Sequence, residues 1–532
     1  MLTRRGLLVA TTAGLATPAI IRPAVAATPK NIVVMAKAID DIIGAFDPGE
    51  GYETTNSEVC GNIYRRIVLP DPHDANKIIG DTAEKWEVSK DGMVLTFHIR
   101  PGMLFDNGKT VTAEDAAFSL QRVVKMNKTP GFILTQFGYT KDNVDKLIVA
   151  KSDSVMEMTL PTLQATTFVL YCLSANCASV VEKARAMANE VNGDLGNAWL
   201  RTHSAGAGNY RLVEWQASEH IILEANPHAA VKPHISRIVM RHTVEPAAQL
   251  LLVQKGDVDI ARDLGADQLK SLGESPDYTY AEKEQLQAMY IALNMGIPQF
   301  QKTEALEAIK WAIDYDSIAK NITPHVWGVW QAFLPKGSPA AIPDKPFKKD
   351  IAKAKALLAK AGFPNGFEVT LDYFAKSPYS DVAQALQANL AEVGIKVQLQ
   401  SGEQKQVISK HRARQFQMLI NTWAPDYVDP NSNTQAFCSD ADDSDNSKLK
   451  IPAWRGHFVN KELTDAVVVA AKELDAKKRT DMYEKMERES LNIAPFVYLL
   501  QQVEVATMRK GVTGLTIGLL PDYTRYTQIV KA

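Results

Sequence analysis

An alternation of strands and helices in the second half of the chain constrains its fold more than any other feature. Residues 367–371 alternate apolar and polar side chains as a half-buried strand does, and residues 395–399 repeat the pattern. Between them, residues 382–390 carry apolar side chains at helical spacing, and Gly394 follows as a helix-ending glycine. A strand, helix and strand of this length favour a parallel, right-handed unit, so we expect an α/β lobe here.

The chain is too long to fold around one hydrophobic core. It has 532 residues, whereas single cores stop growing at about 250–300 residues, so we expect two or more lobes. Hydrophobic residues make up 46% of the chain and charged residues 23%, which is typical of a soluble globular protein. Because the formal net charge is only -2, nucleic acid is not expected as a partner.

Residues 1–26 have the pattern of a signal peptide. Arg4 and Arg5 form a twin-arginine start, which favours the Tat route over Sec. The apolar stretch from Leu7 to Ile21 is short for a membrane span, and residues 24–26 are small, as a cleavage site requires. We therefore expect an exported, periplasmic protein; a short membrane anchor is the alternative.

An oxidising compartment would permit disulfides among the four cysteines. Cys172 and Cys177 are close enough in sequence to pair through a short loop, and Cys60 with Cys438 is the other possible pair. The sequence leaves both pairings open. It contains no Cys-x-x-Cys motif and no His/Cys cluster with zinc spacing, so no metal site is expected.

The first half of the chain contains a compact α+β segment. Residues 86–88 and 94–99 predict paired strands joined by an Asp-Gly turn. Thr112 begins a helix, and Asp115 three residues later completes a capping box. Further strands are expected at residues 144–150, 155–160, 494–500 and 503–506.

The candidate binding feature is the loop of residues 421–430, which follows a buried strand at residues 416–420. Trp423 gives this loop a flat apolar face, and Asp426 gives it negative charge. An aromatic and an acid on a proline-restricted loop suit a ligand with a positive group, although an ordinary Asp/Pro turn is the alternative. The loop falls where a strand ends in an α/β lobe, which is where open α/β sheets bind ligands.

Several short motifs follow one another in a fixed order along nearly the whole mature chain. They occupy residues 81–89, 97–102, 105–109, 112–115, 208–215, 256–261, 311–314 and 354–366, and the loop that begins at Asn421. Each motif is weak alone. Their ordered spacing resembles the extracytoplasmic solute-binding proteins of ABC importers, family 5, the dipeptide- and oligopeptide-binding group.

This resemblance implies an α/β, two-lobed periplasmic-binding-protein clamp (type II, large cluster) with an extra α+β domain inserted in lobe I. A solute would bind between the lobes and favour their closed state. A monomer that delivers its solute to an ABC permease complex in the inner membrane is implied. Lobe I would comprise residues 27–75, 196–295 and 496–532, the inserted domain residues 76–195 and lobe II residues 296–495, with crossings between the lobes near 295 and 495.

The resemblance also implies a role for the acid in the loop. In peptide-binding relatives, an acid in the matching loop holds the α-amino group of the ligand. The frame Trp423-Ala424-x-Asp426-Tyr427 transfers this role to Asp426, although Pro425 departs from the family pattern. The polar start of the helix near residue 56 could face the cleft or simply be solvated. The candidate ligand-binding residues are therefore Asp426, Trp423, Tyr427, Asn421, Tyr52 and Asn56.

A small peptide or peptide-like solute is the main hypothesis for the ligand. The alternatives are an opine, an oligosaccharide or sugar conjugate, and a metal complex or haem. Trp327 and Trp330 could stack on a sugar ring or pack within lobe II. An enzyme is not expected, because the sequence contains no GxSxG elbow, HExxH motif or Walker loop. No catalytic residue and no cofactor is predicted.

Overall fold

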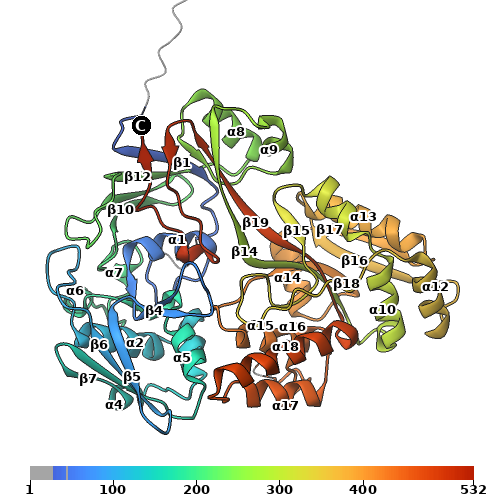
Figure 1. Ribbon diagram of the computed structural model, residues 1–532, viewed down its shortest axis with the longest axis horizontal. Helices are drawn as coiled ribbons and strands as arrows, with labels where there is room; N and C mark the ends of the chain where they lie inside the picture. Colours follow the sequence, from blue (N-terminus) through green and yellow to red (C-terminus); the bar gives the residue numbers. More distant parts are fainter. Residues whose placement is uncertain (1–27, 43–45, 448) are drawn as a thin grey trace, which may run out of the picture.

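The computed structural model describes residues 28–42, 46–447 and 449–532 (Figure 1). The predicted signal peptide at residues 1–26 lies outside the described residues. The described chain forms two lobes joined by a pair of long strands, with a smaller domain beside the first lobe. A search of the described helices finds none with the length and apolarity that a membrane span needs.

A single mixed sheet of 11 strands runs through both lobes, in the order β10-β11-β12-β1-β13-β19-β14-β18-β16-β17, with β15 paired to β19. Lobe I contains β1 (Ile32–Lys37), α1 (Thr54–Ile63), β10 (Tyr210–Gln216), β11 (His220–Ala225), β12 (Arg237–His242), α8 (Pro246–Lys255), β13 (Ile260–Ala261) and α9 (Ala266–Leu272). The two strands that join the lobes are β14 (Tyr278–Leu293) and β19 (Phe496–Arg509).

Lobe II has helices on both faces of its part of the sheet. Its elements are α10 (Thr303–Ala312), β15 (Trp327–Val329), α12 (Ile351–Lys360), β16 (Glu368–Phe374), α13 (Tyr379–Ala391), β17 (Lys396–Gly402), α14 (Gln404–Arg412), β18 (Met418–Trp423), α15 (Asn431–Cys438), α16 (Pro452–Arg455), α17 (Lys461–Ala470) and α18 (Ala476–Ile493). The predicted parallel unit is confirmed, because β16 pairs in parallel with both β17 and β18. The carboxyl ends of these three strands therefore lie at one edge of lobe II.

The inserted domain is built on a separate antiparallel sheet, in the order β5-β6-β8-β7. Its elements are β5 (Ala83–Val88), β6 (Val94–Ile99), α2 (Ala113–Met126), α4 (Val144–Leu147), β7 (Ile148–Ser152), β8 (Val155–Thr159), α5 (Thr166–Cys172) and α6 (Lys183–Ala188). The predicted hairpin and capping box are both present. The strand expected at residues 144–150 is only partly correct, because its first four residues form α4.

A buried ion pair fastens the inserted domain to lobe I. Arg122 on α2 donates two hydrogen bonds, of 2.8 and 2.7 Å, to the two carboxylate oxygens of Asp47 in lobe I, and both side chains are almost inaccessible to solvent. Burial raises the pKa of Asp47, but the Arg122 guanidinium outweighs this effect and keeps that pKa below its usual range. Arg66 of lobe I adds a 2.9 Å bond to the Ser174 carbonyl. The inserted domain is therefore fixed to lobe I.

The strands expected at residues 494–500 and 503–506 are one continuous strand, β19. Polar Gln501 and Gln502 interrupt its apolar pattern, which is why the sequence indicates a break. Gln501 is nevertheless buried, and its amide nitrogen donates 2.9 Å bonds to the carbonyls of Gln285 and Lys336. The pairing of β14 with β19 is irregular between Glu284 and Ala288. The crossings between the lobes that were expected near residues 295 and 495 fall at the end of β14 and the start of β19.

Neither disulfide suggested by the sequence is formed. Cys60, Cys172, Cys177 and Cys438 are all described, and each is a free, buried thiol. Burial raises the pKa of the Cys177 thiol to about 12. A buried thiol of this kind acts as a small apolar group in the core.

The Arg122–Asp47 pair generates a stability prediction. Arg122→Met leaves the Asp47 carboxylate buried without its cation, so we expect the free energy of unfolding to fall by about 3–5 kcal/mol in urea denaturation. Adding Asp47→Asn to Arg122→Met should restore part of this loss. The control is Arg201→Met, at a side chain that is 45% exposed and 3.8 Å from Glu50; if it costs as much as Arg122→Met, the buried pair has no special role.

Candidate functional site

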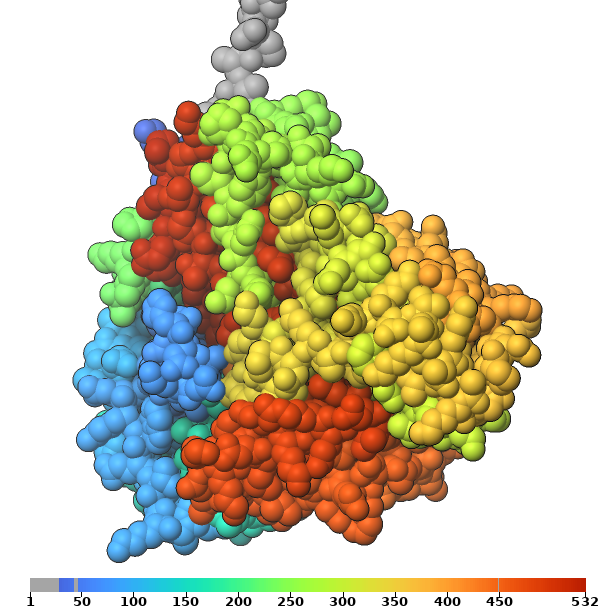
Figure 2. Space-filling model, turned by 45° about the vertical axis from the view of Figure 1, so that its right-hand side comes forward, coloured from blue at the N-terminus to red at the C-terminus, as the bar shows by residue number. Residues whose placement is uncertain are grey.

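The candidate loop lies at the seam between the two lobes. Asp426 on lobe II is half-buried, and the hydroxyl of Tyr52 on lobe I donates a hydrogen bond to its Oδ1 atom. These residues are 374 positions apart in the sequence, so the approach of the lobes brings them together. Figure 2 shows the inserted domain, in blue, against the orange-red helices of lobe II along the same seam. The structure is thus a closed form of the two lobes.

The surroundings of Asp426 disfavour its ionised form. Burial raises the pKa of its carboxyl to about 6, and the hydrogen bond from Tyr52 opposes that increase. The backbone N–H of Asp426 donates a 3.0 Å bond to Ser432 Oγ, which holds the residue at the seam. The raised pKa shows that the described protein compensates this carboxylate poorly when it is ionised. A ligand ammonium at this point would supply the missing charge.

The second acid of the loop, Asp429, has a structural role. Its carboxylate is almost fully buried and accepts bonds of 2.7 and 2.8 Å from the guanidinium of Arg479 on α18. It also accepts a 2.9 Å bond from the backbone N–H of Asn431, the first residue of α15. This network fixes the loop at its carboxyl end, whereas Asp426 is the acid of the two that faces Tyr52 of lobe I across the seam.

Three candidate residues on or beside the loop are engaged with protein neighbours. Trp423 donates a 3.0 Å bond from Nε1 to Asn433 Oδ1. Burial lowers the pKa of His411 well below its usual range, so its ring is neutral and accepts a 3.1 Å bond at Nδ1 from Asn421. Tyr427 is 2% exposed. Its ring centroid lies 5.7 Å from that of Phe168 on α5, so it packs against the inserted domain.

The two candidates on lobe I, Tyr52 and Asn56, lie next to each other at the start of α1. Tyr52 is 38% exposed and reaches Asp426. Asn56 is buried directly below Gly51, where a Cβ atom added to the glycine would lie 2.1 Å from the Asn56 Nδ2 atom. Gly51 is therefore needed for this close approach, and the buried Asn56 Nδ2 atom has no hydrogen-bond partner among the described residues.

Lys376 is a basic residue that the sequence analysis did not select, and its Nζ atom donates a 2.9 Å bond to Gln404 Oε1. It follows β16, so it lies at the same edge of lobe II as the loop that follows β18. The surrounding protein lowers the pKa of its amine, and the carboxylate of Asp40 on lobe I opposes that effect. The rule that ligands bind beyond the carboxyl ends of parallel strands could have selected it. Lys376 places a positive group at the edge that carries Asp426.

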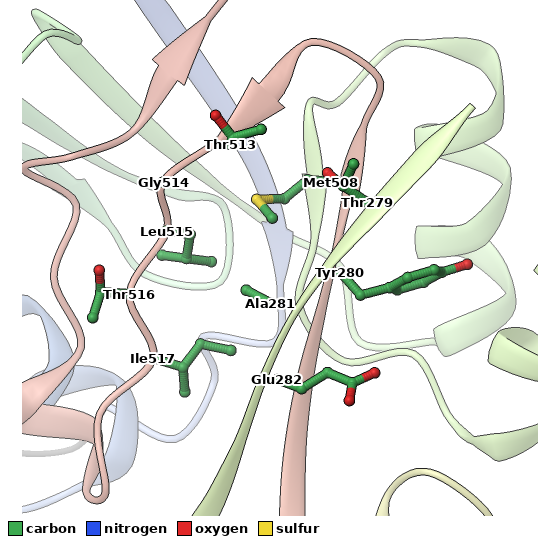
Figure 3. Close-up of a pocket in the computed structure, with 10 residues that line it drawn as sticks. All are labelled: Thr279, Tyr280, Ala281, Glu282, Met508, Thr513, Gly514, Leu515, Thr516 and Ile517. Atoms are coloured by element: carbon green, nitrogen blue, oxygen red, sulfur yellow. The ribbon is translucent and has the colours of Figure 1, made fainter. Parts of the chain in front are cut away.

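Other regions of the described chain offer weaker sites. Trp327 and Trp330 are buried in the lobe II core, so they pack within the lobe. Within the described ranges, no three His, Cys, Asp or Glu side chains are grouped as metal ligands would be. Figure 3 shows a hollow of about 420 Å³ between β14, β19 and residues 513–517. Met508, Leu515 and Ile517 point into it, and none of the six candidate residues lines it.

Two lobes on a shared pair of strands, closed over a poorly compensated acid, define a clamp that binds a solute between its lobes. The family model for bacterial extracellular solute-binding proteins, family 5 (middle region), matches residues 77–445, well over half of the chain. The chain therefore belongs to the bacterial extracellular solute-binding proteins of family 5.

The comparison with individual proteins agrees with this family. The chain is 27% identical over 498 residues to the probable D,D-dipeptide-binding periplasmic protein DdpA of Escherichia coli (strain K12), and the match covers 92% of each chain. Two solved structures show the same fold. One is the periplasmic binding protein DppA of Helicobacter pylori in complex with peptide STSA, with a TM-score of 0.74, 23% identity and 94% and 98% of the chains covered. The other is AgaA of A. tumefaciens R10 with agropinic acid, with a TM-score of 0.68, 24% identity and 92% and 96% covered.

The raised pKa of Asp426 generates a prediction about stability and pH. The folded protein holds a proton on this carboxyl up to about pH 6, above the ordinary value of 3.8, so its ionisation destabilises the fold as pH rises. Asp426→Asn should therefore be more stable than the wild type by at most about 3 kcal/mol above pH 6, from the free-energy equivalent of the pKa shift. The gain should shrink towards zero between pH 6 and pH 4, as measured by chemical denaturation without ligand. A gain independent of pH would contradict the assignment.

Proposed function

We propose that this protein captures a short peptide or peptide-like solute in the seam between its lobes and delivers it to an ABC permease complex. The observation that carries this proposal is the half-buried Asp426 carboxylate, whose raised pKa favours a ligand ammonium. DdpA, the similar protein of Escherichia coli, is named as a probable dipeptide-binding protein. The DppA structure of Helicobacter pylori contains a bound peptide.

A second charge at the same edge supports a ligand with two charged ends. Lys376 follows β16 and Asp426 follows the neighbouring parallel strand β18. A free peptide is a zwitterion, with an ammonium at one end and a carboxylate at the other. We propose that Asp426 binds the ammonium and that Lys376 attracts the carboxylate. Trp423, Tyr427, Asn421, Tyr52 and Asn56 would then shape and support the site around the ligand.

The proposed mechanism is a shift of population between open and closed forms. Closing the lobes over an ionised carboxylate is costly unless a cation accompanies it. A peptide ammonium would offset that cost, so the closed form gains most when the ligand is bound. We place the hinge at the irregular part of the β14–β19 ladder, between Glu284 and Ala288. The division into residues 27–75, 76–195, 196–295, 296–495 and 496–532 remains part of this proposal.

The compartment and assembly belong to the same proposal. The twin-arginine start at Arg4 and Arg5 suits export through the Tat route to the periplasm. A monomer that binds one solute needs neither catalytic residues nor nucleic acid. Transfer of the solute to an inner-membrane permease would follow when the lobes open.

A thermal-shift panel tests the proposed ligand class. Ala-Ala of both configurations, N-acetyl-Ala-Ala and Ala-Ala-amide are compared on the mature protein, because a ligand that binds only the native state raises its melting temperature. Free Ala-Ala should stabilise the protein most. The N-acetyl form should lose the contact to Asp426, and the amide should lose the attraction of Lys376. Lys376→Met should remove the preference for Ala-Ala over its amide, with Lys405→Met as a control at a neighbouring lysine.

The same panel includes agropinic acid, maltose and haem, which represent the alternative ligands. If one of these stabilises the protein and no free peptide does, the peptide proposal is wrong. If both free and N-acetylated peptides stabilise it equally, a peptide binds but Asp426 does not hold its ammonium.

The pH dependence of binding provides a separate prediction. Asp426 must be ionised to hold an ammonium, and its pKa without ligand is about 6. The affinity for Ala-Ala should therefore be constant between pH 6 and pH 7, where the peptide ammonium (pKa about 8) stays protonated, and fall by up to about tenfold for each pH unit below pH 6. Titration calorimetry between pH 5 and pH 7 measures this change. In Asp426→Asn, affinity should be weaker and no longer depend on pH in this range.

A further inference from the structure

The seam between the inserted domain and lobe II is held by specific contacts that do not involve the candidate ligand-binding acid. The backbone N–H of Ala165, which precedes α5, donates a 2.9 Å bond to the carbonyl of Ala471 in lobe II. Gly92 of the inserted domain packs against Leu163 of the same domain and Leu474 of lobe II. A Cβ atom added to this glycine would lie 3.3 Å from Leu163 and 3.4 Å from Leu474. The seam therefore combines polar and apolar contact.

Arg479 on α18 connects this seam to the candidate ligand-binding loop. Its guanidinium has five N–H donors, and each has an acceptor. Four remain within lobe II: two bind Asp429, one binds the Tyr483 hydroxyl at 3.0 Å and one binds the Ala470 carbonyl at 3.0 Å. The fifth donates a 3.2 Å bond across the seam to Thr167 Oγ1 on α5. One side chain thus holds the loop and contacts the inserted domain.

The next residue of α5 strengthens the connection. The Phe168 ring lies 5.8 Å below the Arg479 guanidinium carbon and 5.7 Å from the Tyr427 ring. Tyr427 is the residue after Asp426, and its side chain packs with the buried core residues of the inserted domain. Closing the lobes therefore inserts the side chain next to the candidate ligand-binding acid into the core of the inserted domain.

We propose that the inserted domain is the latch of the clamp. It is fixed to lobe I by the Arg122–Asp47 pair, so it moves with lobe I when the lobes separate. In the closed form, α5 docks on lobe II through Ala165, Thr167 and Phe168, and Arg479 transmits this contact to the loop of Asp426. The latch contacts exist only in the closed form and touch no solute, so they slow the release of solute without selecting it.

This latch rests on the proposed function for the identity of the retained solute, but its effect on closure does not. Two variants each remove one latch bond. Thr167→Val removes the hydroxyl that accepts from Arg479. Ala165→Pro removes the N–H that bonds Ala471, at a backbone φ of -58° that proline adopts without strain. Thr166→Val is the matched control, since this neighbouring threonine makes none of the seam contacts described.

The experiment measures association and dissociation rates of Ala-Ala by stopped flow, and the radius of gyration of the ligand-free protein by small-angle X-ray scattering. A latch acts after the solute is bound, so Thr167→Val and Ala165→Pro should each raise the dissociation rate about three- to tenfold and leave the association rate unchanged. Both should also increase the ligand-free radius of gyration. Thr166→Val should match the wild type in each measurement.

The outcomes separate the latch from a general loss of structure and from the proposed ligand. A lower melting temperature with unchanged dissociation rates would show that α5 has only a structural role, and the latch would be wrong. Unchanged rates and an unchanged radius of gyration in both variants would also overturn it. If Ala-Ala does not bind the wild type, the peptide proposal fails, and the ligand-free scattering of the two variants alone decides the latch.

Discussion

The ion pair between Arg479 and Asp429 is the interaction on which the rest of the site depends. A carboxylate that is 1% exposed is unfavourable in a protein interior unless a cation and hydrogen bonds compensate it. Arg479 supplies both, and the same guanidinium uses its other donors on Tyr483 in α18, on the Ala470 carbonyl in α17 and on Thr167. With Asp429 paired in this way, Asp426 is left at the seam with a raised pKa. The two acids of one loop thus have opposite environments and different roles.

The position of this loop explains how a local charge can affect the whole molecule. It leaves lobe II at the carboxyl end of β18 and meets Tyr52 of lobe I and Phe168 of the inserted domain. Any change in the charge at Asp426 therefore acts where three parts of the structure meet. In the proposed mechanism, a bound cation would favour the closed arrangement by compensating the acid, and the inserted domain would favour it through its contacts with the loop.

The sequence predicted the fold better than the site. The parallel α/β unit, the hairpin of the inserted domain and the Thr112–Asp115 capping box follow from local periodicity and turn chemistry, and the structure contains all three. The break expected within β19 was wrong because Gln501 is polar and buried, with partners from Gln285 and Lys336 that lie far away in the sequence. Lys376, which the proposal adds to the site, has only its position after a strand as a local signal.

The sequence by itself determined the α/β class, the ordered motifs of the family and the presence of an aromatic, acidic loop after a buried strand. Local patterns and motif spacing contain this information, because it depends on residues close together in the chain. Only the tertiary structure decided which acid pairs with an arginine within lobe II and which faces lobe I. Asp426 accepts a hydrogen bond from Tyr52, which lies 374 positions away in the sequence. Asp429 forms its ion pair with Arg479, which lies on α18. Such pairings depend on how distant segments pack against each other, because burial raises the pKa of Asp426 whereas the buried Asp429 is paired with a guanidinium.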